Sequence, residues 1–189
     1  MEYIAKCGDI FLCDSDRMGA KIVKFLQQSP TIWQQIWRYI RRTLEPVRFY
    51  HAGMILSDEQ MIEQQWKVQL DNTDKILSRT VIIYRYKNLT INQETELYNL
   101  AMEDLGKTYD IPQLIGKTLT WLTGIKFFVR LLGAFSKEEE ICVTRIGDWY
   151  KEICSFGVKT QHEITTKIID EYCQNHPEEW KIVYQNLGG

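Results

Sequence analysis

The sequence predicts an α+β protein in which a small antiparallel sheet packs against helices. Runs at 50–66 and 80–86 are rich in β-branched and aromatic residues, as strands are. Stretches at 92–105 and from Cys142 onward repeat apolar residues with the 3.6-residue period of amphipathic helices. With 189 residues, 44% of them hydrophobic, the chain is long enough to form a single domain over 1–189.

The first third of the chain is expected to hold one strand and two helices. Residues 8–12 predict the strand, and 18–28 predict a helix with one apolar side. A second helix is expected over 30–44, because Ser29 is a favourable N-cap and Pro30 is favourable at the first helical position. This helix carries tryptophans on one side and arginines on the other. Packing of the tryptophans on the core is favoured over contact with a membrane surface.

A β-hairpin is expected over 50–66, with a turn of two or three residues. Side chains alternate between the two faces of a strand, so the length of the turn decides which residues share a face. A three-residue turn pairs Gly53 with Glu63 and places His51 diagonally from Glu63 on the same face. A two-residue turn would instead pair Met54 with Glu63 and direct the carboxylate away from His51. The residues allow both registers, and we prefer the first.

The middle of the chain alternates strand and helix. Residues 80–86 are apolar on both faces and are expected to form an inner strand beside the hairpin. The helix over 92–105 should end at Gly106. Residues 111–135 are strongly apolar, but lysines and an arginine interrupt them, so an amphipathic helix pair is expected rather than a membrane span. Ordinary core packing is favoured for this pair over a role as the wall of a substrate cleft.

The C-terminal part is expected to be a helical extension over about 158–189. One helix is predicted over 160–173, and Pro177 has the position of a second helix start. The two histidines of this part, His162 and His176, are assigned no chemistry.

Three side chains far apart in the sequence have the chemistry of an activated thiol: His51, Glu63 and Cys142. A thiol is mostly protonated at neutral pH, and a neighbouring imidazole that takes its proton holds the thiolate as an ion pair. A carboxylate behind the imidazole then fixes the tautomer of the ring. Glu63 is preferred for this role. Gln65 is the alternative, because the three-residue turn places it opposite His51.

Two environments are open for Cys142. A helix that begins near Cys142 would bring the sulfur close to free backbone N–H groups, which stabilise a thiolate. Residues 136–139 also have the composition of a capping box, which would start the helix earlier and bury Cys142 within it. The other thiols are expected to be small apolar fillers, namely Cys7, Cys13, Cys154 and Cys173.

Several short motifs occur in a characteristic order. Gly8 and Asp9 open the first strand, and His51 is followed by alanine and glycine on the hairpin. Residues 105–110 contain a Gly-x-x-Tyr-Asp stretch, and Cys142 comes last. Over about 8–155 this order resembles the circularly permuted NlpC-type cysteine hydrolases, the YiiX-like group.

The resemblance implies a papain-like fold with a rearranged chain order. It also implies that Cys142 is the nucleophile, His51 the general base and Glu63 the third polar residue. The family often has a small serine or alanine after the cysteine, whereas this chain has Val143.

The function implied by the resemblance is hydrolysis of an amide or ester bond through a thioester on Cys142. Peptidoglycan-type peptides and lipid-linked amides are the implied substrate classes. The backbone N–H of Cys142 and the side chain of Tyr50 are candidates to stabilise the oxyanion, and Tyr109 is a further candidate in the cleft. Two alternatives stay open: acyl transfer by the same three residues, and a non-catalytic module that binds a lipid or a peptide.

The charge, histidine and cysteine content limit the binding partners, the cofactors and the cellular location that are expected for this chain. A net charge of −2 lacks the concentrated basic surface of nucleic-acid-binding proteins. No cofactor and no metal are expected, because the three histidines lie far apart and no Cys-x-x-Cys pair occurs. The five cysteines are an odd number, and the first residues do not have the pattern of a secretory segment. A cytoplasmic protein with reduced thiols is expected.

Overall fold

The computed structural model describes residues 3–14, 48–65, 67–108, 119, 142–159 and 164–187. Its centre is a six-stranded antiparallel sheet with the strand order β4-β3-β2-β1-β5-β6. The strands are β1 (Ile10–Cys13), β2 (His51–Ile55), β3 (Gln60–Gln64), β4 (Val68–Asn72), β5 (Val81–Tyr86) and β6 (Trp180–Asn186). The helices within these ranges are α3 (Asp74–Leu77), α4 (Ile91–Glu103), α7 (Cys142–Tyr150) and α8 (Thr166–Asn175). The predicted α+β class with a small antiparallel sheet is therefore confirmed.

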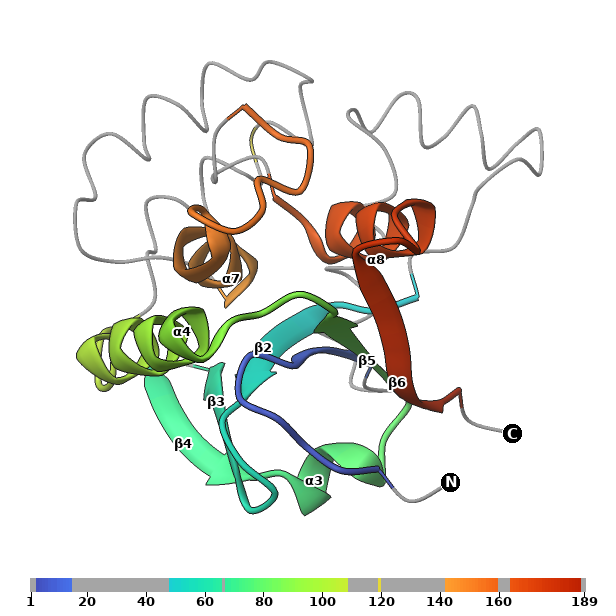
Figure 1. The fold of residues 1–189 in the computed structure, drawn as a ribbon. Helices are drawn as coiled ribbons and strands as arrows, with labels where there is room; N and C mark the ends of the chain where they lie inside the picture. Colours follow the sequence, from blue (N-terminus) through green and yellow to red (C-terminus); the bar gives the residue numbers. More distant parts are fainter. Residues whose placement is uncertain are drawn as a thin grey trace.

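The two faces of the sheet are covered differently. Helices α4, α7 and α8 lie over one face, and the short helix α3 lies at the other (Figure 1). The larger core lies under the three helices and includes Leu12, Met54 and Ile62 of the sheet together with Ile146 of α7. A smaller cluster on the opposite face includes Phe11, Cys13, Ile55, Met61 and Ile76. Alternation along β1 thus sends successive side chains into two different cores.

The hairpin forms in the predicted three-residue register. Gly53 pairs with Glu63 and Met54 with Ile62, while the Leu56 N–H donates to the carbonyl of Gln60 at 2.9 Å. The hydroxyl of Ser57 accepts from the backbone N–H of Gln60 at 3.1 Å, which holds the turn closed. The alternative two-residue turn is excluded by this register.

The inner strand is β5, but its neighbour differs from the prediction. β5 pairs with β1 on one side and β6 on the other, so β1 separates it from the hairpin. The prediction that 80–86 lies directly beside the hairpin is wrong. All four residues of β1 are fully buried, as a central strand requires, and so short a run gives little information on strand order.

The helix predicted over 92–105 is α4, and its ends follow local chemistry. Thr90 and Gln93 form a capping box at the start. Gly106 follows the helix with a φ of +87°, a conformation that favours glycine, and its N–H donates to the Val68 carbonyl at 2.9 Å. This bond ties the end of α4 to β4.

The C-terminal part contains one predicted helix, α8, and one strand that was not predicted. The helix expected from Pro177 is wrong, because the chain makes a single turn there and then forms β6 along β5. The backbone N–H of Trp180 donates to the His176 carbonyl at 2.9 Å, which closes the turn. Pairing with β5 stabilises a strand here, and this long-range contact prevails over the local preference of Pro177 for the first turn of a helix. The extension expected over about 158–189 is thus only partly helical.

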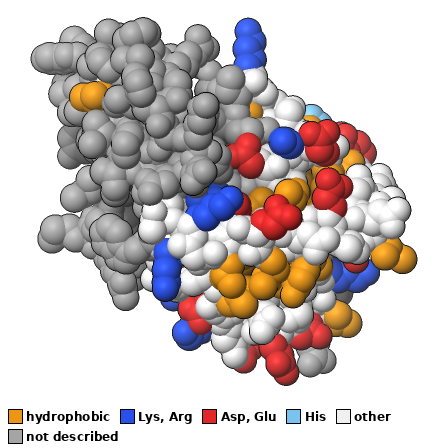
Figure 2. Space-filling model, turned by 90° about the vertical axis from the view of Figure 1, so that its left-hand side faces the viewer, with side chains coloured by type: hydrophobic (Ala, Val, Ile, Leu, Met, Phe, Trp, Pro, Cys, Tyr) orange, Lys and Arg blue, Asp and Glu red, His pale blue; other side chains and the backbone are white. Residues whose placement is uncertain are grey.

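Several predicted segments lie outside the described residues, namely 18–28, 30–44 and most of 111–135. Among the helices within the described ranges, none is long and apolar enough to cross a bilayer. Seen from the side of α4 and β4, the surface carries acidic and basic side chains interspersed with small hydrophobic groups (Figure 2). Neither sign dominates the described part of this face (Figure 2), in keeping with the net charge of −2.

Candidate active site

His51 and Glu63 form a buried pair across the hairpin. His51 is the first residue of β2 and lies opposite Cys13, while Glu63 lies opposite Gly53 on β3. The Nε2 atom of His51 is 2.9 Å from Oε2 of Glu63. Only 8% of His51 and 1% of Glu63 are exposed, so solvent does not compete for this hydrogen bond. The structure brings together the two residues that the hairpin register predicted.

Gly53 allows the sheet to close around this pair. A Cβ atom on Gly53 would lie 2.3 Å from Cζ of Phe11 and 2.6 Å from the Ile62 carbonyl oxygen. The ring of Phe11 thus occupies the space that any larger residue would need. Its centroid is also 6.2 Å from that of His51. The glycine is recognisable in the sequence as part of a motif, whereas Phe11, the side chain that packs over it, is not.

Two other predicted residues lie beside the pair. The side-chain amide of Gln65 donates to Oε1 of Glu63 at 2.5 Å, so it holds the carboxylate rather than the imidazole. The ring centroid of Tyr50 is 5.9 Å from that of His51. Tyr109 lies outside the described residues.

Cys142 is the third predicted residue of the candidate site and lies near His51. It belongs to α7, which is described from Cys142 onward and packs against β2, and 7% of it is exposed. Its side chain lies close enough to His51 to favour the charged form of the imidazole. Because Glu63 engages Nε2, the other ring nitrogen, Nδ1, is the one available to the sulfur. The capping box predicted at 136–139 lies outside the described residues.

The charges of this cluster reinforce one another. Burial works against a charged imidazole, but the negative charge and hydrogen bond of Cys142, together with the hydrogen bond to Glu63, raise the pKa of His51 well above its ordinary 6.5. Burial also works against a charged Glu63, but the hydrogen bond and charge of His51 and the amide of Gln65 lower the pKa of that carboxyl below 4.5. Glu63 and Cys142 therefore both favour the charged form of the His51 imidazole.

The four other thiols that the structure describes have raised pKa values. Burial raises the pKa of Cys13, Cys154 and Cys173. Burial and the charges of Glu94 and Asp9 raise the pKa of Cys7 to about 11. These four thiols are protonated and weakly nucleophilic at neutral pH.

A second buried network fixes α7 on the sheet. Arg145 lies one helical turn after Cys142 and is 2% exposed. Its Nη1 is 2.9 Å from Oδ2 of Asp104, and its Nε donates to Oε1 of Gln64 at 3.2 Å. Gln64 directly follows Glu63 and points to the other face of β3. The strand that carries the Glu63 carboxylate is thus joined to the helix that carries Cys142, a connection that sequence analysis missed.

The Gly8-Asp9 motif has a structural role at the far end of β1. Gly8 has a φ of +88°, and a Cβ there would lie 2.7 Å from Leu89. The carboxylate of Asp9 receives two hydrogen bonds from Arg85 on β5, at 2.6 and 2.7 Å. The motif therefore holds β1 in place and contributes no side chain to the candidate site.

Within the described ranges, no group of three or more His, Cys, Asp or Glu side chains is arranged to hold a metal ion. Nε2 of His51 is engaged by the carboxylate of Glu63, so these two donors of a possible metal site are joined to each other.

Comparison with known proteins gives a fold and no family. No protein-family model matches the chain, and no curated protein matches it in sequence. Among solved structures, the fold is similar to the crystal structure of metalloprotein YiiX from Escherichia coli O157:H7, with a TM-score of 0.57. The match covers 98% of this chain and 100% of YiiX at 12% sequence identity. At that identity the likeness is one of architecture, and this chain has a YiiX-like fold.

Proposed function

We propose that this chain is a cysteine hydrolase that cleaves an amide or ester bond, with Cys142 as nucleophile, His51 as acid and base, and Glu63 as the group that orients His51. The observation that carries the proposal is the buried imidazole held between a carboxylate and a thiol. Each ring nitrogen then has one task, because Nε2 is fixed by Glu63 and Nδ1 exchanges a proton at the reaction centre.

The proposed reaction has two halves. The Cys142 thiolate attacks the carbonyl carbon and forms a C–S bond, and the carbonyl oxygen gains negative charge. Candidates to stabilise that charge are the backbone N–H of Cys142 and the hydroxyl of Tyr50. The intermediate then expels the amine or alcohol, which takes the proton from Nδ1 of His51, and a thioester remains.

Water completes the cycle. His51, now neutral, removes a proton from water, and the hydroxide attacks the thioester carbon. The C–S bond breaks, the acid leaves, and the thiolate and imidazolium are restored. If an alcohol or amine attacks in place of water, the same residues perform acyl transfer.

We further propose that the fold is of the circularly permuted papain-like, NlpC-type. The order of His51 before Glu63 and of both before Cys142 along the chain supports this assignment. By that resemblance, the substrate class is a peptidoglycan-type peptide or a lipid-linked amide or ester. YiiX is described as a metalloprotein, whereas the reaction proposed for this chain uses no metal.

The decisive experiment measures the alkylation rate of Cys142 by iodoacetamide between pH 5 and 9. We expect labelling that persists at pH 6, because the thiolate is held by His51. The four other thiols have raised pKa values, so they contribute little background. His51→Ala should slow labelling at pH 6 by about a hundredfold or more, and Cys142→Ala should abolish it. A rate at pH 6 equal to that of a free thiol would contradict the proposal.

A second candidate function is a non-catalytic module that binds a lipid or a peptide. The low exposure of Cys142, 7%, is the observation in its favour, because a nucleophile needs access to its substrate. A p-nitrophenyl ester separates the two functions by mass spectrometry. Transient acylation of Cys142 supports the hydrolase, while ligand binding that Cys142→Ala leaves unchanged, without any acylation, supports the module.

A further inference from the structure

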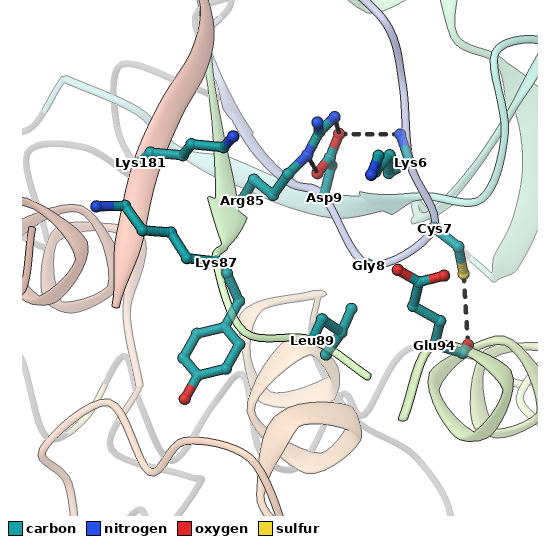
Figure 3. Close-up of a pocket in the computed structure, with 10 residues that line it drawn as sticks. Lys6, Cys7, Gly8, Asp9, Arg85, Lys87, Leu89, Glu94 and Lys181 are labelled. Carbon is teal, nitrogen blue, oxygen red and sulfur yellow. Dashed lines mark hydrogen bonds and ion pairs between the residues drawn. The ribbon is translucent and has the colours of Figure 1, made fainter. Parts of the chain in front are cut away.

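A cavity of about 110 Å³ lies at the opposite end of β1 from His51. His51 pairs with Cys13 at the last residue of β1, whereas the cavity is lined by residues that precede β1, end β5 and begin β6. Its charged lining residues are Lys6, Asp9, Arg85, Lys87, Glu94 and Lys181 (Figure 3). None of them belongs to the candidate active site.

The carboxylate of Asp9 is already neutralised. It is fully buried and receives hydrogen bonds from Nε and Nη2 of Arg85, the hydroxyl of Tyr3 and the backbone N–H of Lys6. A carboxylate with four donors has little capacity left for another cation. Asp9 therefore offsets Arg85 and no other positive charge in the cavity.

The remaining cations exceed the remaining anions. The Nζ atoms of Lys6 and Lys181 make no hydrogen bond or ion pair with any described residue, while Nζ of Lys87 donates to the Pro177 carbonyl at 2.5 Å. Glu94 is the one other carboxylate among the lining residues that the structure describes. The lining thus holds three ammonium groups against one carboxylate, and two of these ammonium groups, those of Lys6 and Lys181, have no partner among the described residues.

Lys6 and Lys181 lie on the two sides of the Arg85–Asp9 pair, whereas Lys87 is directed away from it (Figure 3). Figure 3 shows the side chain of Lys181 directed toward the guanidinium of Arg85, with Lys6 beside Asp9. Glu94 lies apart from them, next to Cys7. Like charges that point at one space repel each other unless an anion occupies it. Lys6 and Lys181 are exposed at the mouth, so a solute can reach them.

We propose that this cavity binds the phosphate group of a phosphate ester. A phosphate carries about −1.5 to −2 charges at pH 7 and offers several acceptor oxygens. Two ammonium groups supply up to six N–H donors, which is more than the two oxygens of a carboxylate can satisfy. The cavity has room for several water molecules, and hence for one tetrahedral oxyanion.

The test is a titration of the ¹⁵N-labelled full chain with inorganic phosphate at low ionic strength, followed by amide chemical shifts. We expect saturable shifts at residues 6–9, 85–89 and 181, which weaken as salt is added. Lys6→Ala with Lys181→Ala should reduce the affinity about tenfold or more. Lys151→Ala removes an exposed lysine outside the cavity and should leave the affinity unchanged.

Glu94→Gln is the sharpest variant, because it should bind phosphate about threefold tighter, and a folding defect cannot produce a gain. Cys142→Ala should bind phosphate like the parent, so failure of the hydrolase proposal and failure of this one are distinguishable. Shifts that never saturate, or that are equal in the parent and the double lysine variant, would overturn the phosphate site.

The source of the phosphate is resolved by two further titrations. Vesicles of phosphatidic acid that bind the parent but not the double lysine variant, with phosphatidylcholine vesicles as the control, indicate a lipid headgroup. Glycerol 3-phosphate that competes with inorganic phosphate, without any vesicle binding, indicates a soluble ester.

Discussion

At the scale of single residues, the carboxylate of Glu63 controls the proton on His51. A carboxylate only accepts hydrogen bonds, so it keeps the proton on Nε2. In the proposed reaction Nδ1 is then left to exchange a proton with the Cys142 sulfur. Glu63→Gln can present an N–H instead and favour the opposite tautomer. We expect turnover to fall by about a hundredfold or more, measured with a p-nitrophenyl ester.

Gln65→Ala is the matched control for this variant. It removes one donor from the same carboxylate without changing its charge, so a loss of only a few-fold is expected. Equal losses in both variants would mean that packing around Glu63, and not its charge, is what matters.

Gly53 sets the space beside the imidazole. In Gly53→Ala the new methyl group collides with Phe11 and the Ile62 carbonyl, so the ring must move toward its neighbours. We expect stability to fall by about 1–3 kcal/mol and the alkylation of Cys142 to become slower, as measured by urea unfolding and iodoacetamide labelling.

Gly106→Ala separates the two effects of adding a methyl group. It meets nothing within 4 Å but lies at a φ of +87°, so it should cost about 1–2 kcal/mol of stability and leave labelling unchanged. Slower labelling in both variants would show that labelling follows stability alone.

At the scale of elements, Arg145 joins α7 to β3 and to the end of α4. Arg145→Met leaves Asp104 with Lys107 and Trp149 but removes the donor from Gln64. We expect a loss of about 3 kcal/mol, because one partner of a buried ion pair is removed, and a change in the pH profile of Cys142 alkylation, because α7 is free to shift.

Lys107→Met is the control, since it removes an exposed partner of the same Asp104 carboxylate. An exposed pair of this kind contributes about 1 kcal/mol or less. Equal destabilisation by the two substitutions would contradict the anchoring role of Arg145.

At the scale of the whole molecule, the imidazole and its partners make stability depend on pH in two directions. The lowered pKa of Glu63 contributes stability that is present above about 4.5 and is lost as the pH falls through the folded value. The raised pKa of His51 contributes stability that is complete below about 6.5 and is lost as the pH rises through the folded value. The combined contribution should therefore be greatest between these two values.

Urea midpoints measured from pH 3 to pH 10 check this dependence. The difference between the parent and His51→Ala should be largest near pH 5 to 6 and decrease on both sides. A difference that does not vary with pH would show that the ring contributes through packing and not through its charge.

The sequence was sufficient for the parts of the fold that local rules control. The hairpin register follows from a three-residue turn and strand alternation, and α4 follows from its capping box and terminal glycine. β4 was missed, because an edge strand that ends in Asp71 and Asn72 has a weak strand signal. β6 was assigned to a helix, because its pairing with β5 depends on a distant segment.

The candidate site also has one part that local sequence rules predict and one part that they do not. His51 and Glu63 are twelve residues apart on one hairpin, so their contact follows from local register. The contact of Cys142 with His51 depends on how α7 packs across the sheet, and no local pattern determines that. The link from Arg145 to Gln64 could not be predicted for the same reason. Arginine and glutamine are mostly found at exposed positions, so neither residue alone indicates a buried contact.

The thiolate proposed for Cys142 and the raised pKa values of the four other thiols also predict how this protein reacts with an oxidant. Peroxides react with thiolates far faster than with thiols, so damage should begin at Cys142 as a sulfenic acid while the buried sulfurs stay intact. Loss of turnover would then precede loss of fold, and a thiol reductant would restore it as long as the sulfur had not reached the sulfinic stage.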